Sequence, residues 1–313
     1  MILTVTLNAA LDVTYELDRM TRHGSTRVQH VHSQAGGKGL NVARTLARLG
    51  SDVRVTGLVG GCRGQQIRHC LSGLPLDDQM VEIAGESRQT VAVVEAAGDP
   101  TELDEPGPLV SDAEWAHFKS RYAETIRAVA VVVLSGSLPP GIPLGGYAEL
   151  IEMGRDSGCT VILDAAGSAL LAGTEGGPDI VAPNRRELLG SLDEPAQRND
   201  VSLVEAARAL QARGAGAVVA SLGPSGLLAS TPVGLWRCRH PKMSGNPLGA
   251  GDALVAGLAR GLELGLSWPD LLVEAAAAAM ASVRARYAGE FEPESLPDLA
   301  RQVRISRIET TTA

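Results

Sequence analysis

Short apolar runs alternate with helical patterns along most of this chain. The runs at 130–134, 160–163 and 217–222 are continuously apolar, which is typical of strands buried on both faces of a sheet. Between such runs, apolar residues recur every three or four positions, which predicts helices. The helical segments predicted in this way are about 36–49, 64–71, 111–128, 146–156, 203–213, 252–266 and 270–287. The repeated alternation predicts an α/β fold with a doubly wound, mostly parallel sheet flanked by helices.

Two parts of the chain do not fit this alternation. Segments within 14–35 and the segment 89–97 show polar residues alternating with apolar ones, as in strands with one exposed face. We assign both to a small β-sheet lid. No linker-like polar tract and no internal repeat divides the sequence, so residues 1–313 are predicted to form one domain that carries this lid. The chain beyond Gly289 is weakly patterned.

Composition restricts the class of protein. Hydrophobic residues make up 44% of the chain but aromatic residues only 3%, so the core must consist mainly of Val, Leu, Ile and Ala. The net charge of −8 argues against nucleic acid or an anionic membrane as a partner. The sequence has no CxxC pair, no HExxH spacing, no secretory signal pattern and no apolar run near the ~18 residues of a membrane span. These features predict a reduced, cytoplasmic protein.

The stretch 246–254 combines glycines with an acidic residue at a predicted helix start. Gly249 and Gly251 allow a tight turn and close approach of the backbone to a ligand, and Asp252 follows at once. The free N–H groups and the dipole of a helix N-terminus favour an anion such as phosphate. The alternative is that Asp252 only caps the helix.

Two further segments have both a structural and a functional interpretation. Lys38 lies in Gly-Gly-Lys-Gly at another predicted helix start, where a cation is unfavourable for the helix itself, so it is expected to face an anionic ligand. The spacing is not that of a P-loop, which requires GxxxxGK[ST]. Asn184 and Glu187 have the spacing of a capping box. They also offer the oxygen ligands that suit a hydrated Mg²⁺.

Polar and glycine-rich residues follow several predicted strands. In open α/β sheets, ligands bind beyond the carboxyl ends of the strands. The residues at these places include Asp12, the segment 135–141, Asp164, Asn184, the segment 223–226 and the segment 249–252. Glycine is common in turns for structural reasons alone, but the joint pattern predicts one ligand site along this edge.

Together these loops resemble the PfkB/ribokinase family of sugar kinases, in particular the branch that acts on phosphorylated hexoses. The matching segments follow the family's order and spacing over nearly the whole chain. They are Asn8–Asp12, Gly36–Ala43, Ser135–Gly141, Asn184–Glu187, Ser221–Gly226 and Gly249–Asp252. The resemblance implies a ribokinase-like fold, a Mg²⁺-dependent reaction and ATP as co-substrate. The acceptor would be fructose 1-phosphate, fructose 6-phosphate or tagatose 6-phosphate.

The resemblance also implies residue roles. Asp252 would be the catalytic base, and the N–H groups of Gly249, Ala250 and Gly251 would stabilise the transferring phosphoryl group. Asp12, Gly37 and Asn41 would bind the sugar hydroxyls. The phosphate already on the sugar would be held by Lys38, Arg88 and Ser137, with Arg27 from the lid as a further candidate. Asn184 and Glu187 would organise Mg²⁺ through water together with the ATP phosphates, and Ser221, Gly223 and Gly226 would border the nucleotide.

Three residues depart from the family pattern. Ala9, Ala182 and Leu248 replace proline, lysine, and threonine or serine, respectively. The missing lysine at 182 removes a positive charge expected near the nucleotide, unless Arg185 or Arg186 compensates for it. Without such compensation, its loss would raise the KM for ATP or change the phosphoryl donor. Ala182 and Leu248 also leave open a non-catalytic sugar-phosphate sensor, and a kinase of an unphosphorylated sugar or nucleoside is a further alternative. The resemblance further implies a homodimer joined through the lid.

Overall fold

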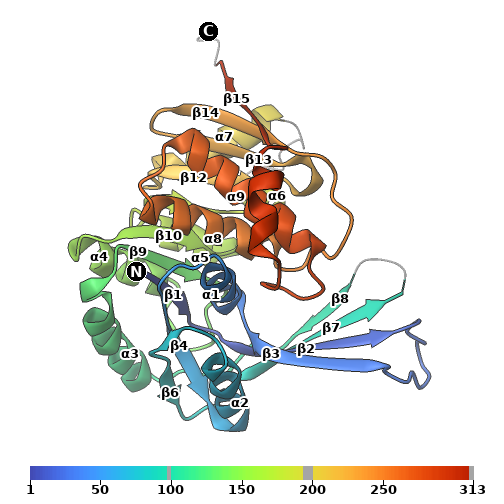
Figure 1. The fold of residues 1–313 in the computed structure, drawn as a ribbon. Coiled ribbons are helices and arrows are strands. Elements are labelled where there is room, and N and C mark those ends of the chain that lie inside the picture. The colour runs from blue at the N-terminus through green and yellow to red at the C-terminus, as the bar shows by residue number, and fades with distance from the viewer. Residues whose placement is uncertain (97–99, 193–199, 310–313) are drawn as a thin grey trace.

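The computed structural model describes residues 1–96, 100–192 and 200–309, and its main feature is a large twisted sheet (Figure 1). The central strands are β1 (Ile2–Thr6), β4 (Val53–Gly60), β9 (Val131–Ser135), β10 (Thr160–Asp164), β11 (Ile180–Val181) and β12 (Ala217–Ser221). At the edges lie β5 (Asp77–Asp78), β6 (Val81–Ile83), β13 (Leu227–Thr231), β14 (Gly234–Arg239) and β15 (Arg304–Ile308). The order is β15-β14-β13-β12-β11-β10-β9-β1-β4-β5, with β6 also paired to β4. In this order, neighbouring strands from β12 to β5 pair in parallel, as do β4 and β6. From β12 to β15, neighbouring strands pair antiparallel.

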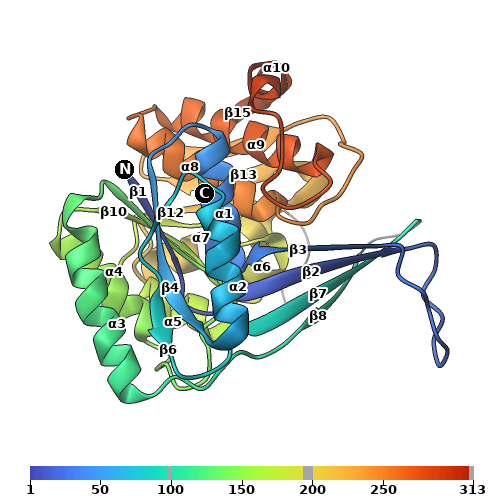
Figure 2. The same cartoon turned by 60° about the horizontal axis from the view of Figure 1, so that its bottom comes forward.

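Helices cover both faces of this sheet, as Figures 1 and 2 show. One face carries α1 (Lys38–Arg48), α2 (Gly61–Ser72), α8 (Ala250–Glu263), α9 (Trp268–Arg284) and α10 (Leu296–Ala300). The other carries α3 (Asp112–Thr125), α4 (Gly146–Asp156), α5 (Gly167–Thr174), α6 (Arg185–Leu189) and α7 (Asp200–Ala212). Alternate side chains of a strand enter opposite cores: in β9, Val131 and Val133 pack on the first face, and Val132 and Leu134 on the second. The predicted doubly wound, mostly parallel fold is confirmed.

A separate small sheet extends from the body (Figures 1 and 2). Its order is β3-β2-β7-β8, formed by β2 (Ala10–Leu17), β3 (His30–Gly36), β7 (Arg88–Glu95) and β8 (Thr101–Asp104). The predicted lid segments 14–35 and 89–97 fall on this sheet, although residue 97 lies outside the described residues. Two details were wrong. Asp12 does not end the first strand but lies within lid strand β2, and β8 was not predicted because its four residues are all exposed and lack apolar alternation.

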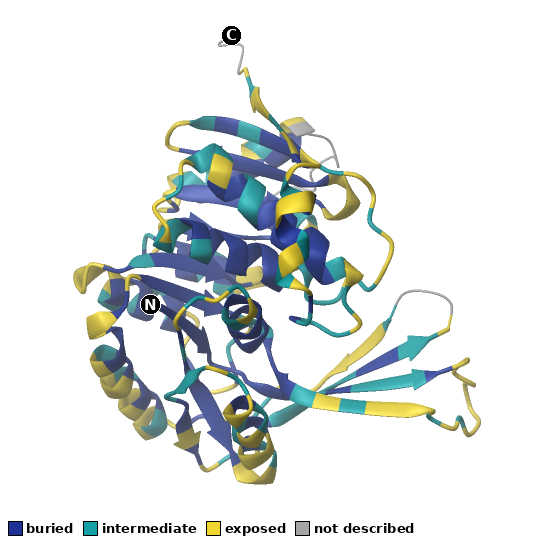
Figure 3. Ribbon diagram, viewed as in Figure 1, coloured by how far each residue is buried: buried dark blue, intermediate teal, exposed yellow. Residues whose placement is uncertain are grey.

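The lid is attached to the body by polar contacts near the end of α9. Glu16 of β2 accepts hydrogen bonds from the Arg286 guanidinium and, at 3.1 Å, from the Tyr287 hydroxyl. The Tyr287 ring stacks on His32 of β3 with a centroid distance of 3.8 Å. Figure 3 shows that the lid is less buried than the central strands. Among the described helices, none combines the length and apolar character needed to cross a membrane.

Candidate active site

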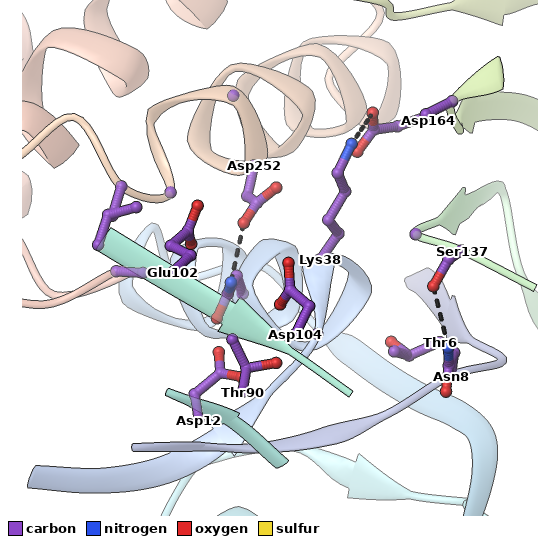
Figure 4. A pocket seen from close by; sticks show the side chains of 18 of the residues that line it. Thr6, Asn8, Asp12, Lys38, Thr90, Glu102, Asp104, Ser137, Asp164 and Asp252 are labelled. Carbon is purple, nitrogen blue, oxygen red and sulfur yellow. Dashed lines mark hydrogen bonds and ion pairs between the residues drawn. The ribbon is translucent and has the colours of Figure 1, made fainter. Parts of the chain in front are cut away.

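Two adjoining cavities lie beyond the carboxyl ends of the parallel strands. The larger, which we call the polar cavity, has a volume of about 1250 Å³ and is bounded by the lid, the start of α1, the strand-end loops and the start of α8. Among its lining residues are Asp12, Gly37, Lys38, Asn41, Arg88, Ser137, Asn184, Glu187, Ser221, Gly249, Gly251 and Asp252. Most of the residues singled out from the sequence are therefore brought together here. Figure 4 shows part of this lining, with side chains from the lid, α1, α8 and the strand ends around one space.

Asp252 lies in the first turn of α8 and is 8% exposed. Its Oδ2 accepts a hydrogen bond of 2.8 Å from the Asn41 side-chain amide of α1. The pKa of Asp252 is raised to about 7, mainly by burial and secondly by the nearby carboxylate of Asp164, against the lowering effects of Lys38 and the Asn41 hydrogen bond. A carboxylate that titrates near neutral pH is suited to accept a proton from a reacting group.

The turn before Asp252 lines the polar cavity through Gly249 and Gly251. Gly249 is the N-cap of α8 with a left-handed φ of 77°, and a Cβ there would lie 2.6 Å from the Cβ of Ala288, so the fold itself requires glycine. At Gly251, a Cβ would meet nothing within 4 Å, so its missing side chain leaves open space beside both cavities. The N–H of Ala250 donates to the Pro247 carbonyl at 3.2 Å. Of the three predicted donors, Ala250 therefore already has a hydrogen-bond partner within the chain.

Lys38 is held by carboxylates. Its Nζ lies 3.1 Å from Oδ1 of Asp164 and 3.8 Å from Oε1 of Glu187. These carboxylates, Asp164 first, raise the pKa of Lys38 above its ordinary value despite burial, so the side chain stays cationic. Asp164 is 4% exposed and also accepts a 2.6 Å hydrogen bond from the Ser135 hydroxyl. Asp164 was noted only as a polar strand-end residue, and nothing local to it in the sequence indicated its pairing with Lys38.

The Asp12 carboxylate lies against the backbone of the turn that opens α1. A Cβ on Gly36 would come within 1.9 Å of Cγ of Asp12, so only glycine leaves room for this carboxylate. Burial raises the pKa of Asp12 to about 6, although Arg44, Arg88 and a hydrogen bond from the Gly37 N–H act in the opposite direction. Asp12 therefore offers hydrogen-bond acceptors to the cavity from the lid side.

Asn8 joins the parts that carry Arg88 and Ser137. Its side-chain amide donates to the Ser137 hydroxyl and to the Pro106 carbonyl, both at 3.0 Å, and its backbone carbonyl accepts a 3.1 Å hydrogen bond from Nε of Arg88. Arg88 also lies 3.7 Å from Asp104 of β8. Asn8 had been noted only as part of a matching segment. Its role depends on residues up to 129 positions away, which no local pattern reveals.

The lid contributes acidic residues that were missed and lacks a basic one that was expected. Glu102 and Asp104 of β8 line the polar cavity. Arg27 lies exposed between β2 and β3 and is not part of the lining. Within this chain, the structure therefore does not bring Arg27 to the other predicted phosphate ligands.

The second cavity, which we call the apolar cavity, has a volume of about 840 Å³ and meets the polar cavity at Asn184, Ser221 and Gly251. The predicted nucleotide residues Ser221, Gly223 and Gly226 line it. So do residues that were not predicted, notably Met243 and one face of α9: Ala276, Ala279, Met280 and Val283. Their spacing of three, one and three residues marks a helix face, and the small alanines leave room for a flat, apolar group.

Asn184 and Glu187 form the capping box that their spacing predicts. The Asn184 side chain accepts from the Glu187 N–H at 3.0 Å, and the Glu187 carboxylate accepts from the Asn184 N–H at 2.8 Å. A parallel bridge joins Asn184 to Ser221, which places the ends of β11 and β12 side by side. The described residues include no group of three His, Cys, Asp or Glu arranged as direct ligands of a metal ion. The oxygens of Asn184 and Glu187 fit Mg²⁺ only as partners of its water molecules.

Comparison with known proteins gives consistent results. A model of the pfkB family of carbohydrate kinases matches residues 5–295. A Thermotoga maritima protein described as a possible 1-phosphofructokinase is 29% identical, with 98% of this chain and 99% of that chain covered and a TM-score of 0.90. Phosphofructokinase-2 of Escherichia coli, solved with fructose-6-phosphate, is 26% identical over 96% and 98% of the two chains, with a TM-score of 0.86. Its tetrameric inhibited form gives 27% identity, the same coverage and 0.86. These findings confirm the resemblance inferred from the sequence and are consistent with its hexose-phosphate branch.

Proposed function

Because the chain belongs to the pfkB family of carbohydrate kinases, we propose that it transfers the γ-phosphoryl group of ATP to a hydroxyl group of a hexose phosphate. Fructose 1-phosphate, fructose 6-phosphate and tagatose 6-phosphate are the candidate acceptors. The observation that carries this proposal is the place of Asp252: a buried carboxylate with a pKa of about 7 that lines the polar cavity in the first turn of α8, directly after Gly251, which lines both cavities.

In the proposed reaction, the sugar lies in the polar cavity with its reacting hydroxyl at Asp252. The carboxylate accepts the hydroxyl proton while the sugar oxygen forms a bond to the γ-phosphorus, and the bond from that phosphorus to the bridging oxygen of ATP breaks to release ADP. Asp12 and the Gly37 backbone bind other hydroxyls. Positioned proton transfer of this kind contributes about 10²- to 10⁴-fold in rate.

The contacts of the cations support separate roles at the two phosphates. Arg88 and Ser137 share Asn8 as a partner, which favours them as ligands of the phosphate already on the sugar. Lys38 is bound by Asp164 and Glu187, and its charge acts on Asp252. We therefore place Lys38 beside the phosphoryl group in transfer, together with the open N–H groups of Gly249 and Gly251, rather than at the sugar's own phosphate.

The apolar cavity suits the adenosine of ATP, because α9 offers it an apolar wall in which Ala276 and Ala279 leave room for a flat ring. Mg²⁺ would neutralise charge on the ATP phosphates when bound, and Asn184 and Glu187 would orient its water molecules. Of the two arginines that follow Asn184, Arg186 lines both cavities and Arg185 only the apolar one. We propose that Arg186 supplies the positive charge of the family's lysine, which Ala182 replaces in this chain.

This assignment has a matched test. Arg186→Gln is expected to raise the KM for ATP by about tenfold, because it removes one charge-assisted hydrogen bond. Arg185→Gln is expected to change the KM for ATP by less than about twofold. Equal effects of the two substitutions in steady-state assays would contradict the role of Arg186.

We also propose a homodimer joined through the lid, because lid strand β3 is an edge strand with an exposed Val31. Sedimentation velocity of the chain and of Val31→Lys measures this. A monomer in both cases would contradict it.

The experiment for the activity is a panel in which ADP formation is measured with ATP, Mg²⁺ and each of the three hexose phosphates, with fructose, tagatose and adenosine as unphosphorylated controls. NMR of the product then assigns the phosphorylated position. We expect kcat/KM for one hexose phosphate to exceed that for every control by about 100-fold, the contribution of one or two charge-assisted phosphate contacts. Preference for a control would indicate the unphosphorylated-sugar or nucleoside alternative. Binding of a hexose phosphate without ADP formation would indicate the sensor.

A further inference from the structure

Arg44 is a buried arginine within helix α1 for which the proposed reaction has no role. It lies one turn after Asn41 and is 4% exposed. Its Nη1 donates to Oδ1 of Asn41 at 3.1 Å and to the carbonyl of Ala288 at 3.0 Å, and its Nη2 donates to the carbonyl of Ala35. None of these partners is a carboxylate. Burying a guanidinium without a direct counter-ion is unfavourable, so this arrangement calls for an explanation beyond helix packing.

The contact with Asn41 determines how the Asn41 amide is turned. A guanidinium only donates hydrogen bonds and an ionised carboxylate only accepts them. Because Nη1 of Arg44 faces one end of the amide, that end must be the oxygen, and the NH₂ must then face Asp252, 2.8 Å from its Oδ2. The three side chains form a directed series in which each group donates to the next, from Arg44 through Asn41 to Asp252.

Arg44 also holds the segment that packs against the turn before Asp252. Ala288, whose carbonyl accepts from Arg44, lies against Gly249, the N-cap of α8. Gly289 has a left-handed φ of 74°, and a Cβ there would lie 3.1 Å from Cδ of Arg44. The guanidinium therefore joins three parts of the chain: α1, the end of β3 at Ala35, and the segment after α9.

We infer that Arg44 is a positioning residue of the active site, which orients the Asn41 amide so that its NH₂ holds the Asp252 carboxylate in place. This inference rests on the proposed function, in which Asp252 is the base. Arg44 itself touches neither substrate in this arrangement. The resemblance assigned Asn41 to the sugar hydroxyls, but its side-chain oxygen and one amide hydrogen are already bonded within the protein. Its main role in this arrangement is therefore to hold the Asp252 carboxylate.

Loss of Arg44 has a defined electrostatic consequence. A freed amide can turn its oxygen toward Asp252, and two facing acceptors are tolerated only if the carboxyl group is protonated. The Asn41 hydrogen bond lowers the pKa of Asp252, so its loss raises that pKa further. The charged groups that act on Asp252 are Asp164, Lys38 and Asp12, and the titratable groups that act on Arg44 are Asp12, Glu290, Cys70 and Arg48. Only Asp12 belongs to both sets, and Arg44 lowers its pKa, so Asp12 is titrated separately in the test.

The test compares Arg44→Met and Arg44→Lys with the unchanged full-length chain, using kcat for the best hexose phosphate at saturating ATP over a range of pH. For Arg44→Met we expect kcat to fall about 10- to 100-fold and the acid limb of its pH profile to move up by about one pH unit. Arg44→Lys, which keeps one donor for the Asn41 oxygen, should recover part of both. Asp12→Asn, added to the unchanged chain and to each Arg44 variant, shows whether a shift of the acid limb of the pH profile reports the titration of Asp12.

Arg48 provides the matched control. It lies one turn further along α1 and donates to the Phe291 carbonyl at 3.5 Å, so it holds the same C-terminal segment without reaching Asn41. Arg48→Met is expected to leave kcat and the acid limb within about twofold and 0.2 pH units of the unchanged chain, as for an exposed contact.

A second background separates positioning from mere stability. If Arg44 acts through the amide, Arg44→Met has little further effect on kcat in a chain that already carries Asn41→Ala, because the effects of residues acting in series are not additive. An equal loss in both backgrounds would show a structural role and overturn the inference. If Arg44→Met does not fold, Asn41→Asp replaces it: this variant keeps the partner of Arg44 but presents oxygen to Asp252, and an unmoved acid limb would overturn the inference.

The outcome also distinguishes this inference from the proposed function. No turnover by the unchanged chain, or full turnover by Asp252→Asn, would overturn the proposed function and this inference with it. Turnover that depends on Asp252, with wild-type kcat and acid limb in Arg44→Met, would overturn this inference alone.

Discussion

The α1–α8 wall of the polar cavity and the lid hold their side chains in different ways. On the wall, Asp252, Asn41 and Arg44 are all at most 8% exposed, and Asn41 is hydrogen-bonded to both of the others. The lid contacts the body through Glu16 and Arg286, and the Arg286 side chain is 63% exposed. Buried groups with satisfied hydrogen bonds stay in one geometry, whereas exposed ion pairs are weak and exchange with water. The comparison indicates that the proposed chemistry resides on the rigid wall and that the lid contributes to binding the sugar.

The largest effect is expected on the wall itself. Asp252→Asn removes the proposed base while keeping shape and the possibility of a hydrogen bond, so kcat should fall by about 10²- to 10⁴-fold. Initial rates of ADP formation measure this, with KM for the sugar phosphate determined alongside. A variant that retains more than about a tenth of the rate would contradict the role of Asp252 as base.

The same variant tests the electrostatic environment of the wall. The pKa of Asp252 in the folded chain, about 7, lies above its ordinary value of 3.8, so the folded state holds the proton more tightly and loses stability as pH rises from about 4 to 7. Asp252→Asn should remove this part of the decline and raise Tm at pH 8 relative to the unchanged chain. Asp12, with a pKa of about 6, contributes a similar decline in both proteins. An unchanged difference in Tm between pH 5 and pH 8 would contradict the raised pKa of Asp252.

The next largest effect is expected at the two glycines before Asp252, where substitution by alanine should have different consequences. Gly251→Ala meets no atom within 4 Å, so the fold should tolerate it, but its methyl group enters the space where the cavities meet. We expect an unchanged Tm and a loss of about 100-fold in kcat/KM for ATP, as for a reacting group misplaced by about 1 Å. Gly249→Ala is the opposite case: with φ at 77° and a contact of 2.6 Å to Ala288, it should lower stability by roughly 2 kcal/mol. Thermal unfolding and kinetics of the pair test this, and a folded, fully active Gly251→Ala would contradict our placement of the phosphates.

A smaller effect is expected on the lid side of the cavity. Arg88→Met should raise the KM for the sugar phosphate by about tenfold or more and change kcat little, because it removes a charged donor from binding but not from the proton transfer. Arg63 is a matched control, since both arginines contact Glu105 but only Arg88 lines the polar cavity. If Arg63→Met raised KM as much as Arg88→Met, the effect would come from Glu105 and the lid loop rather than from bound phosphate.

The smallest effect is expected at the attachment of the lid. Glu16→Gln weakens the contacts with Arg286 and Tyr287 and should change the KM for the sugar phosphate by at most about fivefold. The Arg286 partner lowers the pKa of Glu16, so this contact persists at neutral pH and is lost only as pH falls through that lowered value. At 1 M salt the difference between the two proteins should disappear because exposed charges are screened. A difference that persists at 1 M salt would show that Glu16 is not acting as an exposed ion pair.

The sequence by itself determined the features that depend on neighbouring residues. The buried strands β9, β10 and β12 and the capping box at Asn184 all occur where the patterns predicted them. Side-chain period and capping hydrogen bonds act over at most a few positions, so they can be read along the chain. The strand-end location of the site followed from the same patterns, since parallel strands present their carboxyl ends at one edge.

Only the tertiary structure decided which side chains meet. Asn41 and Asp252 are 211 positions apart, Lys38 and Asp164 126, and Asn8 and Ser137 129, and no local period links such pairs. The exposed strand β8 forms because β7 offers it a partner, not because of its own pattern. The sequence thus predicted the chemical groups of the site, while their hydrogen-bond partners, and with them the charge of Lys38 and the pKa of Asp252, arise from burial and long-range contacts that exist only in the folded chain.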